Sequence, residues 1–205
     1  MVCHIPLEVQ GTLLATGIMT QQHAIFGKGS KYFITISADN RVRLWDVDSN
    51  NERRCFVEKH HLSHSYTCST WGQTNRDDLG LFAVGSSDGV VIIWDLTRGV
   101  VARTIGKPNE SSIPSDIAFS KDMTTLFVCY LSSSHIDEYN VVDGQLKQTH
   151  KGLKKGAARL ALSPSSQSMA VARYASSHPL LPSIDNLTFF PISLSLLYIY
   201  ITVVP

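Results

Sequence analysis

Cysteine and histidine gather in one short stretch of this 205-residue chain, between positions 55 and 68. Cys55, His60, His61, His64 and Cys68 are residue types that bind zinc, which takes four nitrogen or sulfur ligands in a tetrahedral arrangement. The stretch lacks the paired Cys-x-x-Cys spacing of many structural zinc sites. Two interpretations are open: a metal site, or a structural role with the cysteines on separate strands and the histidines in a connecting loop. We favour the structural role.

Asp39 and Asp88 are candidates for a pair of acid–base carboxylates. General acid–base catalysis requires both groups to reach one substrate. Each aspartate instead precedes a turn-forming residue, Asn40 or Gly89, which favours a role in two separate turns. The sequence contains no Gly-rich phosphate loop and no nucleophile-elbow motif. We therefore predict a protein that is not an enzyme, with no catalytic, cofactor-binding or metal-binding residues and no small-molecule substrate.

One basic cluster has side chains that would suit RNA phosphates. It consists of Lys147, Lys151, Lys154, Lys155 and Arg159. The cluster contains no aromatic side chain on which a base would stack. We favour a solvated loop over an RNA site.

The chain contains an internal repeat that must position these groups. Ser37–Asp46 and Ser86–Asp95 share the order Ser-x-Asp, an apolar run and a closing Trp-Asp, and Trp45 and Trp94 stand 49 positions apart. A period of about 40–45 residues with this ending is typical of the blades of a β-propeller. Each blade is a four-stranded antiparallel sheet that cannot bury both faces alone. The predicted fold class is therefore all-β, a partial WD-repeat β-propeller.

Two complete copies of the repeat are followed by weaker ones. The expected strands are short, apolar or β-branched, and separated by turns: 32–36, 42–45, 53–57, 81–84, 90–94, 100–105, 117–119, 125–129, 135–140, 145–149, 159–164 and 169–172. Tyr139 takes the place of Trp45 and Trp94 in a third copy. We expect these three rings to be buried at equivalent positions. His61 stands where such repeats often carry a histidine that hydrogen-bonds within the blade.

The composition changes at about Ala175, so we divide the chain into a lead-in (1–23), a partial propeller of three blades and an incomplete fourth (24–174), and an apolar tail (175–205). The last 19 residues, Leu187–Pro205, carry no charge and are just long enough to span a bilayer. Pro191 interrupts the segment and no Lys or Arg follows it, so we favour an alternative or aberrant C-terminus over a membrane anchor. We expect the tail not to complete the fourth blade, and to pack loosely or against an exposed blade edge.

Charge and cysteine usage restrict the environment of the protein. The net charge of +1 selects neither nucleic acid nor acidic partners. Residues 1–22 lack the basic start and apolar core of a secretory signal. We therefore expect reduced thiols in the cytosol or nucleus.

Beyond the generic repeat, the chain resembles one family over about residues 24–172. The matching residues are Ala24-Ile25-Phe26, Lys31-Tyr32-Phe33, Ser37-x-Asp39, Arg43-Leu44-Trp45, His61-Leu62-Ser63, Thr67-Cys68, Trp71, Leu81-x-Ala83-x-Gly85, Gly89 and His135-Ile136-x-Glu138-Tyr139-Asn140-Val141. They are similar to the N-terminal propeller of a nucleolar WD-repeat protein, a transcription-linked subunit of the small-subunit processome.

This resemblance implies a scaffold in ribosome biogenesis, acting in pre-rRNA processing and rDNA transcription. Its expected location is the nucleolus. Its expected partners are other WD-repeat processome subunits, with indirect contact to pre-rRNA and no membrane partner. The later blades and the C-terminal helical region of that family are missing from this sequence. Three rivals stay open: a WD-repeat adaptor of another complex such as a ubiquitin-ligase substrate receptor, a tail-anchored membrane protein and, ranked last, a propeller hydrolase.

Overall fold

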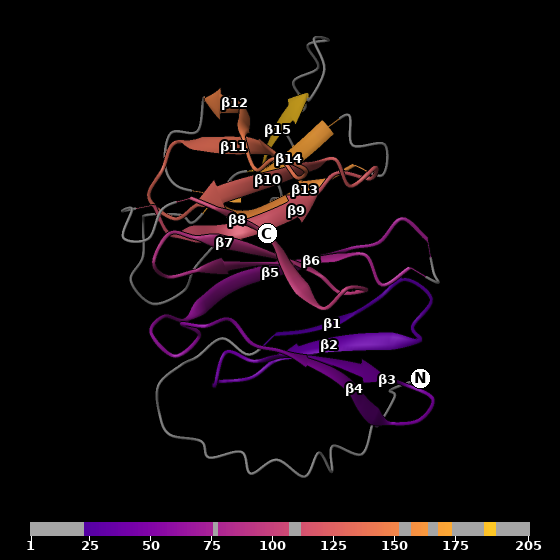
Figure 1. Ribbon diagram of the computed structural model, residues 1–205. Coiled ribbons are helices and arrows are strands. Elements are labelled where there is room, and N and C mark those ends of the chain that lie inside the picture. Colours follow the sequence, from indigo (N-terminus) through magenta and orange to yellow (C-terminus); the bar gives the residue numbers. More distant parts are fainter. Residues whose placement is uncertain are drawn as a thin grey trace, which may run out of the picture.

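A computed structural model describes residues 23–75, 78–106, 112–151, 157–163, 168–173 and 187–191. These residues form strands and turns, with no helix among them. The strands form four sheets that succeed one another along the chain, from the indigo sheet to the orange and yellow one (Figure 1). The all-β class and the propeller-like order of sheets agree with the sequence prediction.

Three of the sheets have four antiparallel strands each, paired in chain order. We call them blades 1, 2 and 3. Blade 1 contains β1 (His23–Phe26), β2 (Tyr32–Ile36), β3 (Val42–Asp46) and β4 (Asn51–Phe56). Blade 2 contains β5 (Tyr66–Gly72), β6 (Leu81–Ser86), β7 (Val91–Asp95) and β8 (Val100–Ile105). Blade 3 contains β9 (Pro114–Phe119), β10 (Thr125–Tyr130), β11 (His135–Asn140) and β12 (Leu146–Lys151).

Tight turns between the second and third strands of blades 1 and 2 depend on the two aspartates. The Oδ1 atom of Asp39 accepts a hydrogen bond from the Arg41 amide at 3.2 Å, and that of Asp88 accepts one from the Val90 amide at 3.3 Å. The residues after them, Asn40 (φ 55°) and Gly89 (φ 92°), have the left-handed conformation that these residue types adopt readily. The turn role predicted for both aspartates is therefore confirmed.

Apolar side chains on facing sheets form the core between blades. Ile34 and Leu44 of blade 1 pack with Val84 and Trp94 of blade 2. Because successive side chains on a strand point to opposite faces, the other face of blade 2 is free to meet blade 3. Ile93 belongs to that second core, together with Ile117, Leu126 and Val128.

The first strand of each blade lies beside the first strand of the next one, and single side chains join them. Ser69 Oγ on β5 contacts His23 Nδ1 on β1 at 3.1 Å. Thr67 Oγ1 donates to the Pro114 carbonyl of β9 at 2.6 Å. Asp116 Oδ2 accepts the Leu160 amide of the fourth sheet at 2.8 Å. These bonds align the blades around a common line of first strands.

The fourth sheet has three described strands, β13 (Ala157–Leu162), β14 (Ser168–Arg173) and β15 (Leu187–Pro191), in that order. β15 pairs antiparallel with β14 from Ser168↔Pro191 to Ala172↔Leu187. It thus takes the third place of the blade, which β3, β7 and β11 hold in the other sheets. Its sequence Leu-Thr-Phe-Phe-Pro lacks the Trp-Asp ending. The tail was expected to pack loosely or against an exposed blade edge, and these five residues pair with β14 at a blade edge. Most of the apolar segment lies outside the described residues.

The equivalence of Trp45, Trp94 and Tyr139 is confirmed by the strand registers, since they oppose Phe33, Phe82 and Leu126 at matching places. The prediction that all three rings are buried is wrong for two of them. Trp94 is buried between blades 1 and 2, whereas Trp45 and Tyr139 are only half-buried. Trp45 lies on the face of blade 1 that points away from blade 2, and Tyr139 borders a pocket.

Within the described ranges, no helix is long and apolar enough to cross a membrane.

Candidate functional site

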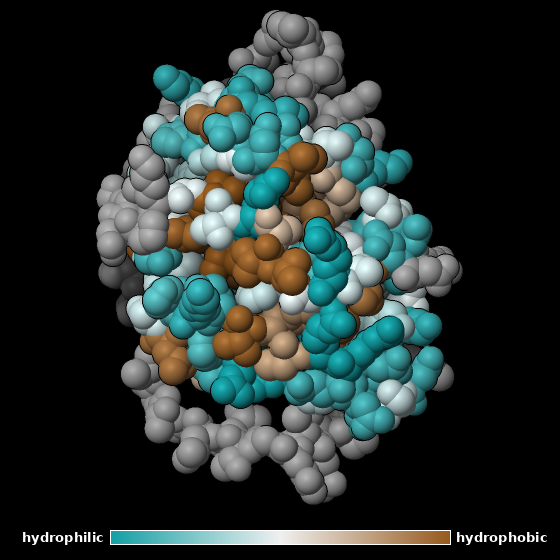
Figure 2. All heavy atoms as spheres, in the orientation of Figure 1, coloured by the Kyte–Doolittle hydropathy of each residue, from teal (hydrophilic) through white to brown (hydrophobic). Residues whose placement is uncertain are grey.

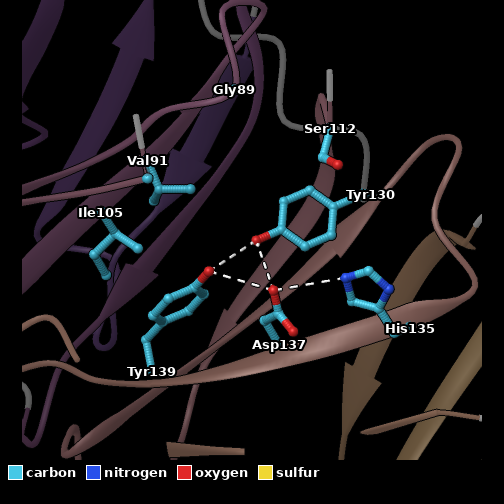
Figure 3. A pocket seen from close by; sticks show the side chains of 9 residues that line it. Gly89, Val91, Ile105, Ser112, Tyr130, His135, Asp137 and Tyr139 are labelled. Carbon is cyan, nitrogen blue, oxygen red and sulfur yellow. Dashed lines mark hydrogen bonds and ion pairs between the residues drawn. The ribbon is translucent and has the colours of Figure 1, made fainter. Parts of the chain in front are cut away.

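Polar side chains converge in a pocket between blades 2 and 3, with a volume of about 160 Å³. Blade 3 supplies Tyr130 from the end of β10, and His135, Asp137 and Tyr139 from β11. Figure 3 shows both tyrosine hydroxyls and the His135 ring directed at the Asp137 carboxylate. Val91 and Ile105 of blade 2 form an apolar wall on another side.

The Asp137 carboxylate is almost completely buried and has several hydroxyl partners. Its Oδ2 atom accepts hydrogen bonds from Tyr130 and Tyr139, each at 3.3 Å, and the two hydroxyl oxygens are 3.2 Å apart. Its Oδ1 atom accepts a shorter bond, 2.8 Å, from the Thr149 hydroxyl of β12. The His135 Nε2 atom lies 3.7 Å from Oδ2. The carboxylate is thus held in place by neutral donors.

These groups suit binding rather than bond-breaking chemistry. Burial raises the pKa of Tyr130 above its ordinary value, and the hydrogen bond with Tyr139 and the charge of Asp137 raise it further. The Tyr130 hydroxyl therefore stays protonated and donates. A protonated phenol beside a carboxylate is a hydrogen-bonding site, and it offers no activated nucleophile.

This pocket was not predicted from the sequence, which indicated no catalytic, cofactor-binding or metal-binding residues. His135, Asp137 and Tyr139 alternate along β11 and so share one face of the sheet. That spacing was visible in the sequence. Tyr130 and the apolar wall of blade 2 join the site only through strand pairing and blade packing, which the spacing does not reveal.

The cysteine and histidine stretch is spread over two blades and the loop between them. Cys55 lies on β4 and Cys68 on β5, where Cys68 packs in the core between blades 2 and 3. The described residues contain no group of three or more His, Cys, Asp or Glu side chains that could hold a metal ion. The placement of the cysteines on separate strands agrees with the structural interpretation.

The histidine that approaches a turn aspartate is His64, not His61. The His64 side chain is buried, and its Nδ1 atom lies 3.7 Å from Asp88 Oδ2. The Nδ1 atom of His61 instead bonds the Glu58 carbonyl in its own loop at 2.8 Å. The amide of Asn40 fixes this loop by donating to the carbonyls of His61 and His64. The loop therefore docks on the turn of blade 1.

Thiol reactivity should separate the three described cysteines. Burial raises the pKa of Cys68 to about 12 and raises that of Cys129 as well, whereas Cys55 is only half-buried. Because the thiolate is the reactive form, we expect Cys68 and Cys129 to react with a disulfide reagent at pH 8 roughly tenfold or more slowly than Cys55. Timed labelling with peptide mass spectrometry measures this. Rapid labelling of Cys68 in the folded protein would contradict the packing described.

Charged groups on the outer face of blade 1 form a small ion-pair network. Arg43 contacts Asp39 at 3.0 Å and Glu52 at 3.5 Å. Partial burial opposes ionisation of Asp39, but the hydrogen bonds from Arg43 and the Arg41 amide hold the pKa of that carboxyl below its usual value. Trp45 lies beside this network, with its Nε1 atom donating to Thr35 Oγ1 at 2.9 Å. Asp39 thus pairs with arginine within one blade.

The predicted basic cluster is only partly described. Lys147 contacts Glu138 at 3.4 Å and donates to Thr125 Oγ1 at 2.9 Å. Lys151 is exposed on β12 and Arg159 is exposed on β13. Lys154 and Lys155 lie outside the described residues. The charge of Lys147 is therefore engaged within blade 3.

Blade 2 differs from blade 1 at one buried contact. Val84 on β6 occupies the register position that Thr35 holds on β2, since both lie two residues beyond the partner of the tryptophan. The Trp94 Nε1 atom is buried and, among the described residues, has no hydrogen-bond partner. The loss of the threonine hydroxyl explains this unpaired donor.

Comparison with known proteins gives three informative relatives, and no family model matches the chain. The chain is 33% identical over 118 residues to Mitochondrial division protein 1 of Aspergillus niger and 35% identical over 118 residues to that of Aspergillus clavatus. It is 31% identical over 106 residues to the WD repeat-containing protein WDS homolog of Arabidopsis thaliana. Each match covers 51% of this chain but only 16%, 16% and 19% of the respective relative. The successive antiparallel sheets, the two Trp-Asp strand ends and this similarity together identify the described part of the chain as a partial WD-repeat β-propeller.

Proposed function

We propose that this protein is a non-catalytic scaffold that holds other proteins together. The observation that carries this proposal is apolar surface on the outer strands of blades 2 and 3. Val100 and Val101 on β8, Leu146 on β12 and Val142 in the turn before β12 are exposed. Arg103 Nε connects the two blades by donating to the Val142 carbonyl at 2.6 Å. Figure 2 shows apolar side chains gathered across the middle of the viewed face. Exposed apolar patches mark interaction sites in many soluble proteins.

We assign the scaffold to ribosome biogenesis, in pre-rRNA processing and rDNA transcription. The support is the resemblance to a nucleolar processome subunit, in which the segment His135–Val141 is the most specific part. That same segment carries Asp137 and Tyr139 of the pocket. The proposed partners are WD-repeat subunits of that assembly, and the proposed location is the nucleolus.

A second candidate follows from the relatives. Two of them are named for mitochondrial division, which favours an adaptor role in a different complex. The similarity covers 16% of each of these proteins. We therefore rank this candidate below the nucleolar scaffold.

Affinity purification combined with imaging distinguishes the two. We expect a tagged copy expressed in its native cells to concentrate in the nucleolus and to co-purify with processome WD-repeat subunits. Depletion of the endogenous protein should cause early pre-rRNA to accumulate or its synthesis to fall. Enrichment on mitochondria with unchanged pre-rRNA would support the second candidate, and a diffuse protein without stable partners would contradict both.

A further inference from the structure

We propose that the pocket between blades 2 and 3 binds the primary ammonium group of a lysine side chain presented by a partner protein. This goes beyond a general scaffold role and does not depend on which complex the protein joins. The pocket lies between two complete blades, and the residues that line it are among the described ones.

Asp137 is a buried carboxylate without a Lys or Arg partner among the described residues. Its Oδ2 atom and the hydroxyl oxygens of Tyr130 and Tyr139 form a triangle with sides of 3.3, 3.3 and 3.2 Å. Among the described residues, no Lys or Arg forms an ion pair with Asp137, and its basic neighbour is His135, whose Nε2 atom lies 3.7 Å from Oδ2 and is charged only when the ring is protonated. A buried carboxylate is costly unless it is paired, so a ligand that brings both charge and protons is favoured.

The triangle of three oxygen atoms matches an ammonium group. An ammonium is a compact charge with three donors, one for each oxygen of the triangle. A guanidinium group binds best by a planar fork across both carboxylate oxygens. The Oδ1 atom of Asp137 is already engaged by Thr149 at 2.8 Å. The site therefore favours lysine over arginine.

The shape of the pocket suits a lysine side chain. The apolar side chains of Val91 and Ile105 line it across from the tyrosine hydroxyls (Figure 3). A lysine side chain buries its methylene stem along apolar surface and keeps its charged end among polar groups. The pocket volume of about 160 Å³ is close to the volume that roughly five water molecules occupy in the liquid. An alkylammonium chain therefore fits, whereas a folded domain or an aromatic cofactor does not.

The site is particular to blade 3. Asp137 opposes Val128 on β10, and the matching places on β7 and β3 hold Ile92 and Arg43, which oppose Val84 and Thr35. A carboxylate stands at this position in blade 3 alone among the three complete blades. Repetition of the blade pattern does not account for it.

The test uses the full 205-residue chain and a single-charge probe, Nα-acetyl-lysine N-methylamide. Titration is followed by NMR signals of the tyrosine rings. The matched control is Nα-acetyl-norleucine N-methylamide, which keeps the alkyl chain and lacks the ammonium, and the arginine analogue tests selectivity. We expect the lysine probe to bind with a Kd of about 1 mM, as suits one buried ion pair, and both comparison probes to bind at least about tenfold more weakly.

Variants identify the site. Asp137→Asn should weaken binding of the lysine probe about tenfold or more, and Tyr139→Phe should weaken it severalfold. Asp143→Asn, which changes an exposed aspartate on the same blade, should leave it unchanged. Melting curves show whether each variant folds, and Tyr139→Phe carries the test if Asp137→Asn does not. Equal binding of the norleucine probe, no binding of the lysine probe, or unchanged binding in folded Tyr139→Phe would overturn the proposal.

Discussion

Replacing Phe82 by alanine should lower the free energy of unfolding by about 3–5 kcal/mol, the usual cost of removing a fully buried phenylalanine. The Phe82 side chain is completely buried and packs in the core that joins blades 1 and 2. The strands around Phe82 are held in place by their hydrogen bonds to neighbouring strands. The described residues therefore cannot readily move into the space that the ring would leave. We expect a lower melting temperature and a lower denaturant midpoint.

The repeat offers a matched control for this experiment. Phe33 holds the equivalent place in blade 1, opposite Trp45 as Phe82 is opposite Trp94. Its ring stacks on Trp45 with centroids 5.9 Å apart, but it is only half-buried on the outer face of the blade. Phe33→Ala should therefore cost about 1–2 kcal/mol, since less apolar area leaves water on folding. Equal losses at both positions would show that the outer face of blade 1 is covered as well as the core.

The strand pattern was predictable because it depends on local chemistry. The bounds predicted for β2, β8 and β11 agree with the structure. Alternating apolar residues specify strands, and the Asp39-Asn40 and Asp88-Gly89 pairs specify the turns between them. These signals are contained in neighbouring residues, so no tertiary information was needed.

Burial and site formation were less predictable because they depend on neighbouring blades. Trp45 and Trp94 stand in the same Trp-Asp ending of equivalent strands, yet of the two only Trp94 meets the core of an adjacent sheet. The same reasoning applies to the pocket, where Asp137 from blade 3 meets the wall formed by Val91. His64 is a further case, because its distance to Asp88 depends on how a loop folds back. A blade repeat predicts which positions are equivalent and leaves open which surfaces cover them.

A single hydroxyl group should improve the stability of blade 2. Val84→Thr is expected to raise the free energy of unfolding by about 1 kcal/mol, because an unsatisfied buried donor costs about 1–3 kcal/mol. Trp45 Nε1 in blade 1 donates to Thr35 Oγ1 at 2.9 Å. Trp94 Nε1 in blade 2 has no partner among the described residues, and Val84 stands at the place of Thr35. Threonine has nearly the shape of valine, so the change adds the missing acceptor without enlarging the side chain.

Two further substitutions test whether the stability gained by Val84→Thr comes from a hydrogen bond to the Trp94 indole. Val171→Thr changes a fully buried valine of β14, packed among Phe127, Cys129 and Met169. It should lower stability by about 1–3 kcal/mol, because it places a hydroxyl in the apolar cluster of Phe127, Cys129 and Met169. Thr35→Val removes the acceptor from Trp45 and should lower stability by about 0.5–1.5 kcal/mol. Chemical denaturation of the variants with one protocol measures all three changes. If Val84→Thr loses stability as Val171→Thr does, Trp94 already has a partner, such as a bound water, and the unpaired donor is not the weak point of blade 2.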